Sequence, residues 1–141
     1  MTDDVKVRVK KVLDDYLEAC QHRKTPERYA ILDAVYSIDK HFTLEELGEY
    51  LSKSGFRVSR ATLYNTIHLL VELKLVVRHG LAQGTKYEAS LGRENHVHQV
   101  CTVCGGVTDI DAPLVTQAIG QTQLHDFRCD EFALYLSLIH I

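Results

Sequence analysis

The sequence has no hydrophobic run that approaches the roughly 20 residues needed to span a lipid bilayer. Its first residues, Met1 to Asp4, are partly acidic and lack the apolar stretch of a signal peptide. These absences predict a cytoplasmic protein with no membrane partner, in which the four cysteines stay reduced. Under those conditions a Cys-x-x-Cys pair indicates metal binding or redox chemistry rather than a structural disulfide.

An excess of positive charge is also missing. The net charge is −3, so the total charge does not indicate a nucleic-acid-binding protein. The charge is unevenly distributed, however: residues 1–80 hold 13 Lys and Arg against 12 Asp and Glu, and residues 81–141 hold 3 against 7. This asymmetry favours a DNA-facing first half and a cation-binding second half, although two ordinary solvated surfaces would explain it equally well.

Helical periodicity and capping signals predict helices throughout the first half. Apolar residues recur at helical spacing from Val5 to Leu17, which predicts a first amphipathic helix. A second helix begins at Thr25-Pro26, because Pro suits the first helical position. Thr43 and Glu46 form a capping box, in which each side chain can satisfy the backbone amide of the other, at the start of a third helix that ends before Gly55.

A fourth helix, capped by Ser59 and continuing to about Lys74, has two different faces. One side gathers Leu63, Thr66, Ile67 and Leu70. The other side gathers Arg60, Ala61, Tyr64 and His68, with Asn65 just beyond. A helix that enters the major groove needs such a surface of donors, acceptors and an aromatic ring. A small α-helical domain with a half-exposed tyrosine is the alternative interpretation.

Two short strands at residues 76–78 and 85–88 follow, around Gly80–Gly84, and predict a β-hairpin. A capped helix, a polar-faced helix and a hairpin in succession are typical of a winged helix-turn-helix. We therefore predict an α+β protein, with an N-terminal winged helix-turn-helix DNA-binding domain over residues 1–90. A small α/β metal-binding dimerisation domain occupies residues 91–141.

The densest chemistry of the sequence lies in the second half. If residues 96–100 are extended, His96 and His98 point to the same face and form a natural pair of ligands for one ion. Cys101-x-x-Cys104, followed by two glycines, has the form of a zinc knuckle. Thiolates favour zinc or iron–sulfur chemistry, whereas imidazole with carboxylate suits Fe(II), Mn(II) or Zn(II), so the ligand types indicate two different sites.

A strand over 107–110, a helix from Leu114 to about Gln123 and a strand over 132–136 complete the predicted second half. Such a unit suits dimerisation, because a sheet continued across two subunits buries the strand edges.

An enzyme is disfavoured on two grounds. A zinc deaminase needs His-x-Glu, whereas this segment is His96-x-His98. A thioredoxin-like redox role needs a helix directly after the cysteine pair, and Gly105-Gly106 argues against one. A metal-stabilised protein-interaction module that binds no DNA remains an alternative from another class.

The order of these features resembles the ferric uptake regulator (Fur) family of metal-dependent repressors, from about Arg23 to Tyr135. The resemblance is carried by Arg23-x-Thr25-x-x-Arg28, Ser59-Arg60-Ala61-Thr62-Leu63-Tyr64 and His96-x-His98-x-x-Cys101-x-x-Cys104-Gly105. It implies a homodimer that represses transcription by binding AT-rich inverted repeats of double-stranded DNA when loaded with Fe(II) or Mn(II). A peroxide-sensing Fe(II)-dependent repressor and a zinc-uptake repressor are alternatives within the family.

The resemblance also implies roles for particular residues. Tyr64 would contact thymine in the major groove and Arg23 would lie near the minor groove, while Asn65 stands where some members have Arg. The predicted DNA-binding residues are Arg23, Arg28, Arg60, Tyr64, Asn65 and His68. The regulatory ion would bind His41, Glu88, His96, His98 and Asp109. An ion bonded to both halves of the chain would favour one relative orientation of the two, which would couple metal binding to DNA binding.

The sequence departs from the family pattern in two places. A further metal site of some members would fall on Asn95, Val97, Thr116 and Phe132, so we expect that site to be absent. The family usually has a second Cys-x-x-Cys after its last strand, whereas this sequence continues from Leu136 to Ile141 without one and looks truncated. The structural Zn(II) ligands Cys101 and Cys104 then lack their usual partners, for which Cys129 and His140 are the available substitutes.

Overall fold

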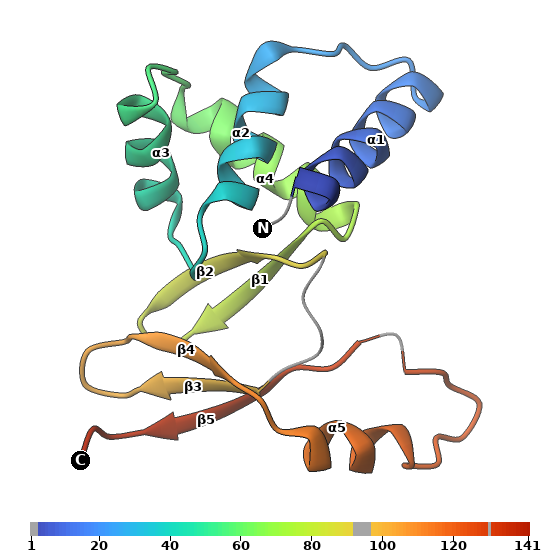
Figure 1. The fold of residues 1–141 in the computed structure, drawn as a ribbon, viewed down its shortest axis with the longest axis vertical. Coiled ribbons are helices and arrows are strands. Elements are labelled where there is room, and N and C mark those ends of the chain that lie inside the picture. Colours follow the sequence, from blue (N-terminus) through green and yellow to red (C-terminus); the bar gives the residue numbers. More distant parts are fainter. Residues whose placement is uncertain (1–2, 92–96, 130) are drawn as a thin grey trace. The chain divides into compact units, whose positions relative to one another are not determined.

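The computed structural model describes residues 3–91, 97–129 and 131–141. The chain forms two compact units, unit 1 over Met1–Arg93 and unit 2 over Glu94–Ile141. Unit 1 contains four helices and a hairpin, and unit 2 contains a small sheet and one helix (Figure 1). The α+β class predicted from the sequence is confirmed.

Unit 1 has the element order of a winged helix-turn-helix. Its elements are α1 (Asp3–Ala19), α2 (Pro26–Ser37), α3 (Leu44–Lys53), α4 (Arg60–Glu72), β1 (Val76–Leu81) and β2 (Gly84–Ala89). The strands of the hairpin are longer than predicted. Gly80 pairs with Thr85 inside the ladder, so the expectation of a loop over Gly80–Gly84 was wrong. The turn is confined to residues 82–83 and is followed by Gly84, whose φ of +127° favours glycine.

The predicted caps explain where α3 and α4 begin. Thr43 Oγ1 accepts a hydrogen bond from Glu46 N at 3.2 Å, and the Glu46 carboxylate in turn accepts one from the Thr43 hydroxyl. Ser59 Oγ accepts a hydrogen bond from Thr62 N at 3.1 Å. The Thr43 and Ser59 side chains thus each satisfy an amide group that a helix start leaves without an intrahelical partner, whereas Glu46 contacts the Thr43 hydroxyl rather than the Thr43 amide of the predicted capping box.

One continuous apolar core joins the four helices to the hairpin. It includes Val9, Leu13, Leu17, Ile31, Val35, Phe42, Leu47, Leu51, Leu63, Ile67, Leu70, Val76 and Tyr87. Buried Tyr36 of α2 connects this core to both ends of the hairpin: its hydroxyl donates to Leu75 O at 2.7 Å and accepts from Leu91 N at 3.1 Å. The β1–β2 hairpin, which is the wing of this fold, is therefore attached to the helices by apolar packing and by directional hydrogen bonds.

Unit 2 is a three-stranded sheet with one helix. Its elements are β3 (Val97–Cys101), β4 (Val107–Ile110), α5 (Pro113–Gly120) and β5 (Leu134–Leu138). The strand order is β4-β3-β5, with β4 antiparallel and β5 parallel to β3. The last strand begins two residues later than the predicted 132–136, and α5 ends at Gly120 rather than near Gln123. Within the described ranges, every helix is too short or too polar to cross a lipid bilayer.

Candidate metal centre and nucleic-acid interface

Two buried imidazoles of unit 1, those of His41 and His79, meet around the buried carboxylate of Glu88. Glu88, which is 3% exposed, directs Oε1 toward His79 Nε2 at 2.8 Å and Oε2 toward His41 Nε2 at 3.4 Å. The two imidazole rings lie 5.2 Å apart between centroids. A carboxylate and two imidazoles are borderline ligands of the type that Fe(II), Mn(II) and Zn(II) accept, so this donor set fits a divalent ion.

Strand pairing explains why these residues meet. Phe42 pairs with Tyr87 through two backbone hydrogen bonds of 2.8 and 2.9 Å, which places the preceding His41 opposite the following Glu88. His79 of β1 pairs with Lys86 of β2. Because side chains alternate along a strand, Glu88, two residues beyond Lys86, shares the face of His79. Antiparallel pairing therefore gathers one residue from each of three segments.

Sequence reasoning included His41 and Glu88 but missed His79. The reason is the length assigned to β1, since a strand that stops at residue 78 leaves His79 in the loop. A signal was available: His79 follows Val77 at a spacing of two residues, so an extended strand would place it on the same face.

The imidazole of His98, in unit 2, lies on the central strand of its sheet. His98 of β3 pairs across the sheet with Asp109 of β4 and with Tyr135 of β5. The Asp109 carboxylate lies 2.9 Å from His98 Nδ1, and the His98 and Tyr135 rings are stacked with centroids 5.2 Å apart. These contacts fix the orientation of the His98 ring and leave Nε2 as the atom suited to a metal ion. The predicted ligand His96 lies outside the described residues.

The cysteine pair forms the tight turn that the sequence predicts. Cys104 N donates to Cys101 Sγ at 3.5 Å, and Gly106 N donates to Cys104 Sγ at 3.4 Å. Donation from the backbone amides of Cys104 and then Val103 lowers the pKa of the Cys101 thiol below its usual value, which favours the thiolate form that binds metals.

His140 is the residue that the structure brings to this cysteine pair. Its Nε2 lies 3.8 Å from Cys104 Sγ, and one donor atom from each of Cys101, Cys104 and His140 lies within 4.8 Å of the others. The thiol of Cys129, the other substitute considered, contacts Glu131 O instead. Two thiolates and an imidazole are a donor set that zinc accepts.

The site expected to be absent has few donors where the structure describes it. Val97 is buried in β3, Thr116 lies on α5 and Phe132 precedes β5, while Asn95 lies outside the described residues.

The polar face of α4 is exposed, as predicted. Tyr64 is 56% exposed and stacks on His68 with an interplanar angle of 7°. His68 Nε2 in turn lies 3.5 Å from Glu72, and Arg60 lies 3.7 Å from Glu45 of α3. The opposite face, formed by Leu63, Thr66, Ile67 and Leu70, is buried in the core. One helix thus combines a packed face with an exposed face of donors and an aromatic ring.

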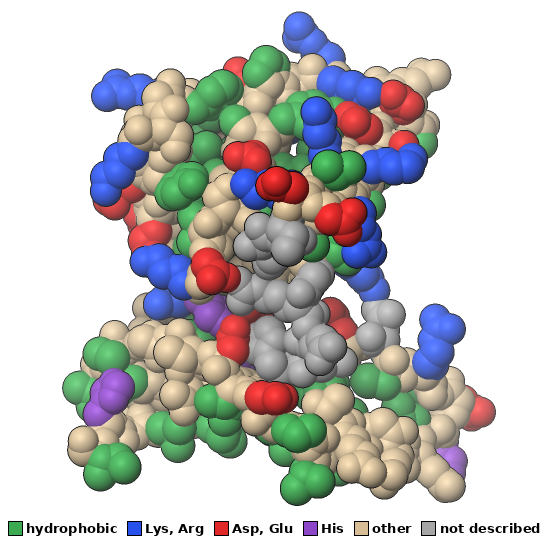
Figure 2. All heavy atoms as spheres, viewed as in Figure 1, with side chains coloured by type: hydrophobic (Ala, Val, Ile, Leu, Met, Phe, Trp, Pro, Cys, Tyr) green, Lys and Arg blue, Asp and Glu red, His purple; other side chains and the backbone are tan. Residues whose placement is uncertain are grey.

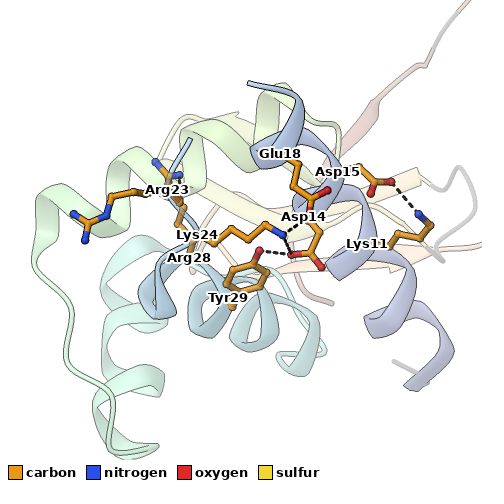
Figure 3. Close-up of polar contacts among 8 residues, drawn as sticks. All are labelled: Lys11, Asp14, Asp15, Glu18, Arg23, Lys24, Arg28 and Tyr29. Carbon is orange, nitrogen blue, oxygen red and sulfur yellow. Dashed lines mark hydrogen bonds and ion pairs between the residues drawn. The ribbon is translucent and has the colours of Figure 1, made fainter. Parts of the chain in front are cut away.

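The segment between α1 and α2 carries Arg23 and is held by a network of contacts (Figure 3). Lys24 Nζ lies 2.5 Å from Glu18 and 3.7 Å from Asp14, both on α1. Arg28 Nη1 donates to Arg23 O at 2.8 Å. These contacts hold the backbone of Arg23 from both sides.

Tyr29 extends this network into α2. Its hydroxyl donates to Asp14, and this hydrogen bond is the largest cause that lowers the pKa of the Asp14 carboxyl. Burial, and then the same contact, raise the pKa of Tyr29. Donation to Glu18 raises the pKa of Lys24. The junction of α1 and α2 is thus held by a hydrogen bond from Tyr29 to Asp14 and by ion pairs of Lys24 with Asp14 and Glu18.

The view in Figure 2 shows most of the visible Lys and Arg side chains on unit 1 and few on unit 2. This distribution follows the charge asymmetry of the sequence.

The fold and these clusters define a class of protein: a winged helix-turn-helix joined to a small α/β unit, with candidate metal ligands in both units. Within this class, the model of the "Ferric uptake regulator family" matches residues 19–137, and the chain belongs to that family.

Individual relatives agree. The chain is 33% identical to the ferric uptake regulation protein of Campylobacter upsaliensis over 94 residues, which cover 64% of this chain and 60% of the relative. It is 30% identical to the peroxide-responsive repressor PerR of Staphylococcus aureus over 100 residues, covering 67% and 64%. The matches span less than two thirds of either relative. The Helicobacter pylori ferric uptake regulator has the same fold, with a TM-score of 0.78 at 15% identity, covering 94% of this chain and 91% of that one.

Proposed function

We propose that this protein is a metal-responsive transcriptional repressor that acts in the cytoplasm by binding double-stranded DNA as a homodimer. The observation that carries the proposal is the exposed polar face of α4, in the same unit as the β1–β2 wing and the buried cluster around Glu88. An α-helix fits the major groove, and the Tyr64 ring offers an apolar contact for a thymine methyl group. Arg60, Asn65 and His68 provide further groups on or beside that face, and Arg23 and Arg28 supply positive charge at the start of α2.

The regulatory ion is most simply Fe(II) or Mn(II), bound by His41 and Glu88 of unit 1 together with His96, His98 and Asp109 of unit 2. The chemistry of the donors supports this assignment, because imidazoles and carboxylates without thiolates suit these ions. An ion that takes ligands from both units would stabilise one arrangement of the units, and DNA affinity would rise by the ion's differential affinity for that arrangement.

Dimerisation is proposed for unit 2. None of the residues of α5 is buried, although Leu114 and Ile119 are apolar, and Phe127 is 82% exposed. Exposed apolar groups of this kind, together with the edge strands β4 and β5, suit a second copy of the chain. Zn(II) bound by Cys101 and Cys104 would brace the end of β3 in each subunit.

Anaerobic fluorescence anisotropy on an AT-rich inverted repeat tests the proposal, with Fe(II), Mn(II) and Zn(II) titrated separately at fixed salt. Tyr64→Ala should weaken metal-dependent binding by about 5- to 150-fold, because one good base contact contributes about 1–3 kcal/mol. Tyr50→Ala removes a partly exposed tyrosine of α3 that is not among the predicted DNA-binding residues, and it serves as the control for DNA contact. Glu88→Gln should prevent the metal ion from raising the affinity for DNA, so that DNA binding stays weak at every metal concentration. Absence of site-specific binding with every metal would favour a protein-interaction module instead.

A peroxide-sensing repressor is the second candidate, and the identity to the Staphylococcus aureus peroxide-responsive repressor favours it. Peroxide added to the DNA complex separates the candidates, since only a peroxide sensor should release DNA, and only when loaded with Fe(II). Binding that responds to Zn(II) alone would indicate a zinc-uptake repressor.

A further inference from the structure

His79 is a buried histidine that the proposed function does not use. It is 1% exposed and lies on the face of the β1–β2 hairpin that carries Glu88, opposite to the face of Val76 and Tyr87, which belong to the apolar core. Burying an imidazole away from water is costly unless specific partners compensate. The partner here is the carboxylate of Glu88, which is the residue of unit 1 that offers an anionic ligand to the proposed ion.

We infer that His79 is a further ligand of the regulatory ion, so that unit 1 supplies three donors, His41, His79 and Glu88. The inference rests on the proposed metal-responsive function and adds a residue and a ligand count to it.

The distances among the three side chains match those within a coordination sphere. With metal–ligand bonds of about 2.0–2.1 Å, adjacent ligand atoms are separated by about 2.9 Å in octahedral and about 3.4 Å in tetrahedral geometry. The Glu88 oxygens lie 2.8 Å from His79 Nε2 and 3.4 Å from His41 Nε2. Donor atoms of the three residues all lie within 4.8 Å of one another. An ion would therefore need only small side-chain movements to reach all three.

Both imidazoles direct the same kind of atom, Nε2, toward the carboxylate. The other role open to His79 is that of a positioning residue that only donates a hydrogen bond to Glu88. The two roles differ in what can replace the imidazole. A glutamine side chain can donate to Glu88 through its amide but is a poor ligand for these ions, so His79→Gln separates the roles.

Mn(II) is the appropriate probe, because it prefers oxygen and nitrogen donors and avoids the thiolates of Cys101 and Cys104. The affinity of the full chain for Mn(II) is measured from the electron paramagnetic resonance signal of free Mn(II). The number of coordinated imidazoles is measured by pulsed resonance of the bound ion. The variants are His79→Ala, His79→Gln and Glu88→Gln, with His22→Ala as the control for an exposed histidine of the same unit. Circular dichroism verifies that each variant is folded.

We expect His79→Gln to weaken Mn(II) binding at least about 100-fold and to remove one imidazole from the coordination sphere, whether or not His79→Ala folds. A residue that only positions Glu88 should tolerate this change, because the glutamine amide still donates to the carboxylate. Near-parental affinity of His79→Gln with an unchanged imidazole count would overturn the inference while leaving the proposed function intact. If Glu88→Gln also binds Mn(II) like the parent, the proposed regulatory site itself is wrong.

Discussion

The hydroxyl of Tyr36 provides a direct test of how the wing is attached to the helices. Tyr36→Phe removes a single oxygen and leaves the ring in the core, so little cavity is created. Two hydrogen bonds are lost, one to Leu75 O and one from Leu91 N. Leu75 O keeps a second donor, Ser90 N at 3.2 Å, so this carbonyl is not left without a partner. At about 0.5–1.5 kcal/mol per hydrogen bond, the expected loss of unfolding free energy is about 1–3 kcal/mol.

Urea denaturation followed by helical circular dichroism measures this loss, because the signal comes mainly from α1 to α4 of unit 1. Tyr50→Phe, on partly exposed α3 surface, is the matched control and should change stability by less than about 0.5 kcal/mol. Amide exchange at Leu91 should also accelerate in Tyr36→Phe. A loss equal to that of the Tyr50 control, with unchanged exchange at Leu91, would refute the argument that these hydrogen bonds attach the wing.

Three further predictions concern other parts of the chain. Ser59→Ala removes the N-cap of α4 and should destabilise unit 1 by about 1 kcal/mol in the same urea assay; an unchanged midpoint would show that the cap is dispensable. Tyr29→Phe removes the main cause of the lowered pKa of Asp14. A depressed carboxyl pKa contributes stability above the unfolded value of 3.8 that is lost as pH falls through the folded pKa, so the deficit of this variant should be present at pH 6 and vanish in acid. A deficit independent of pH would contradict that assignment. Cys101→Ser should lower the zinc retained after dialysis by one ion per chain, measured by atomic emission, whereas Cys129→Ser should retain the parental content.

Much of the local structure was determined by the sequence itself. Thr43 and Ser59 specify where α3 and α4 begin, because their side chains replace the missing intrahelical acceptors. The two-faced pattern of α4 is equally local: Leu63 and Ile67 are buried and Tyr64 is exposed, as their spacing around the helix requires. The tight turn from Cys101 to Gly105 is also local, because Gly105 adopts a φ of +74° that favours glycine.

The tertiary structure decided which distant residues meet. His41, His79 and Glu88 are separated by many positions, and their proximity depends on the register of β1 with β2 and on the pairing of Phe42 with Tyr87. The hydrophobic periodicity of the sequence does not predict this register, because the packing of the whole unit sets which residues pair. The same holds for Tyr36, whose hydroxyl reaches Leu91 N across 55 positions of the chain. Helix caps and faces are properties of neighbouring residues, whereas the cluster of His41, His79 and Glu88 is a property of strands that pair only when the core has formed.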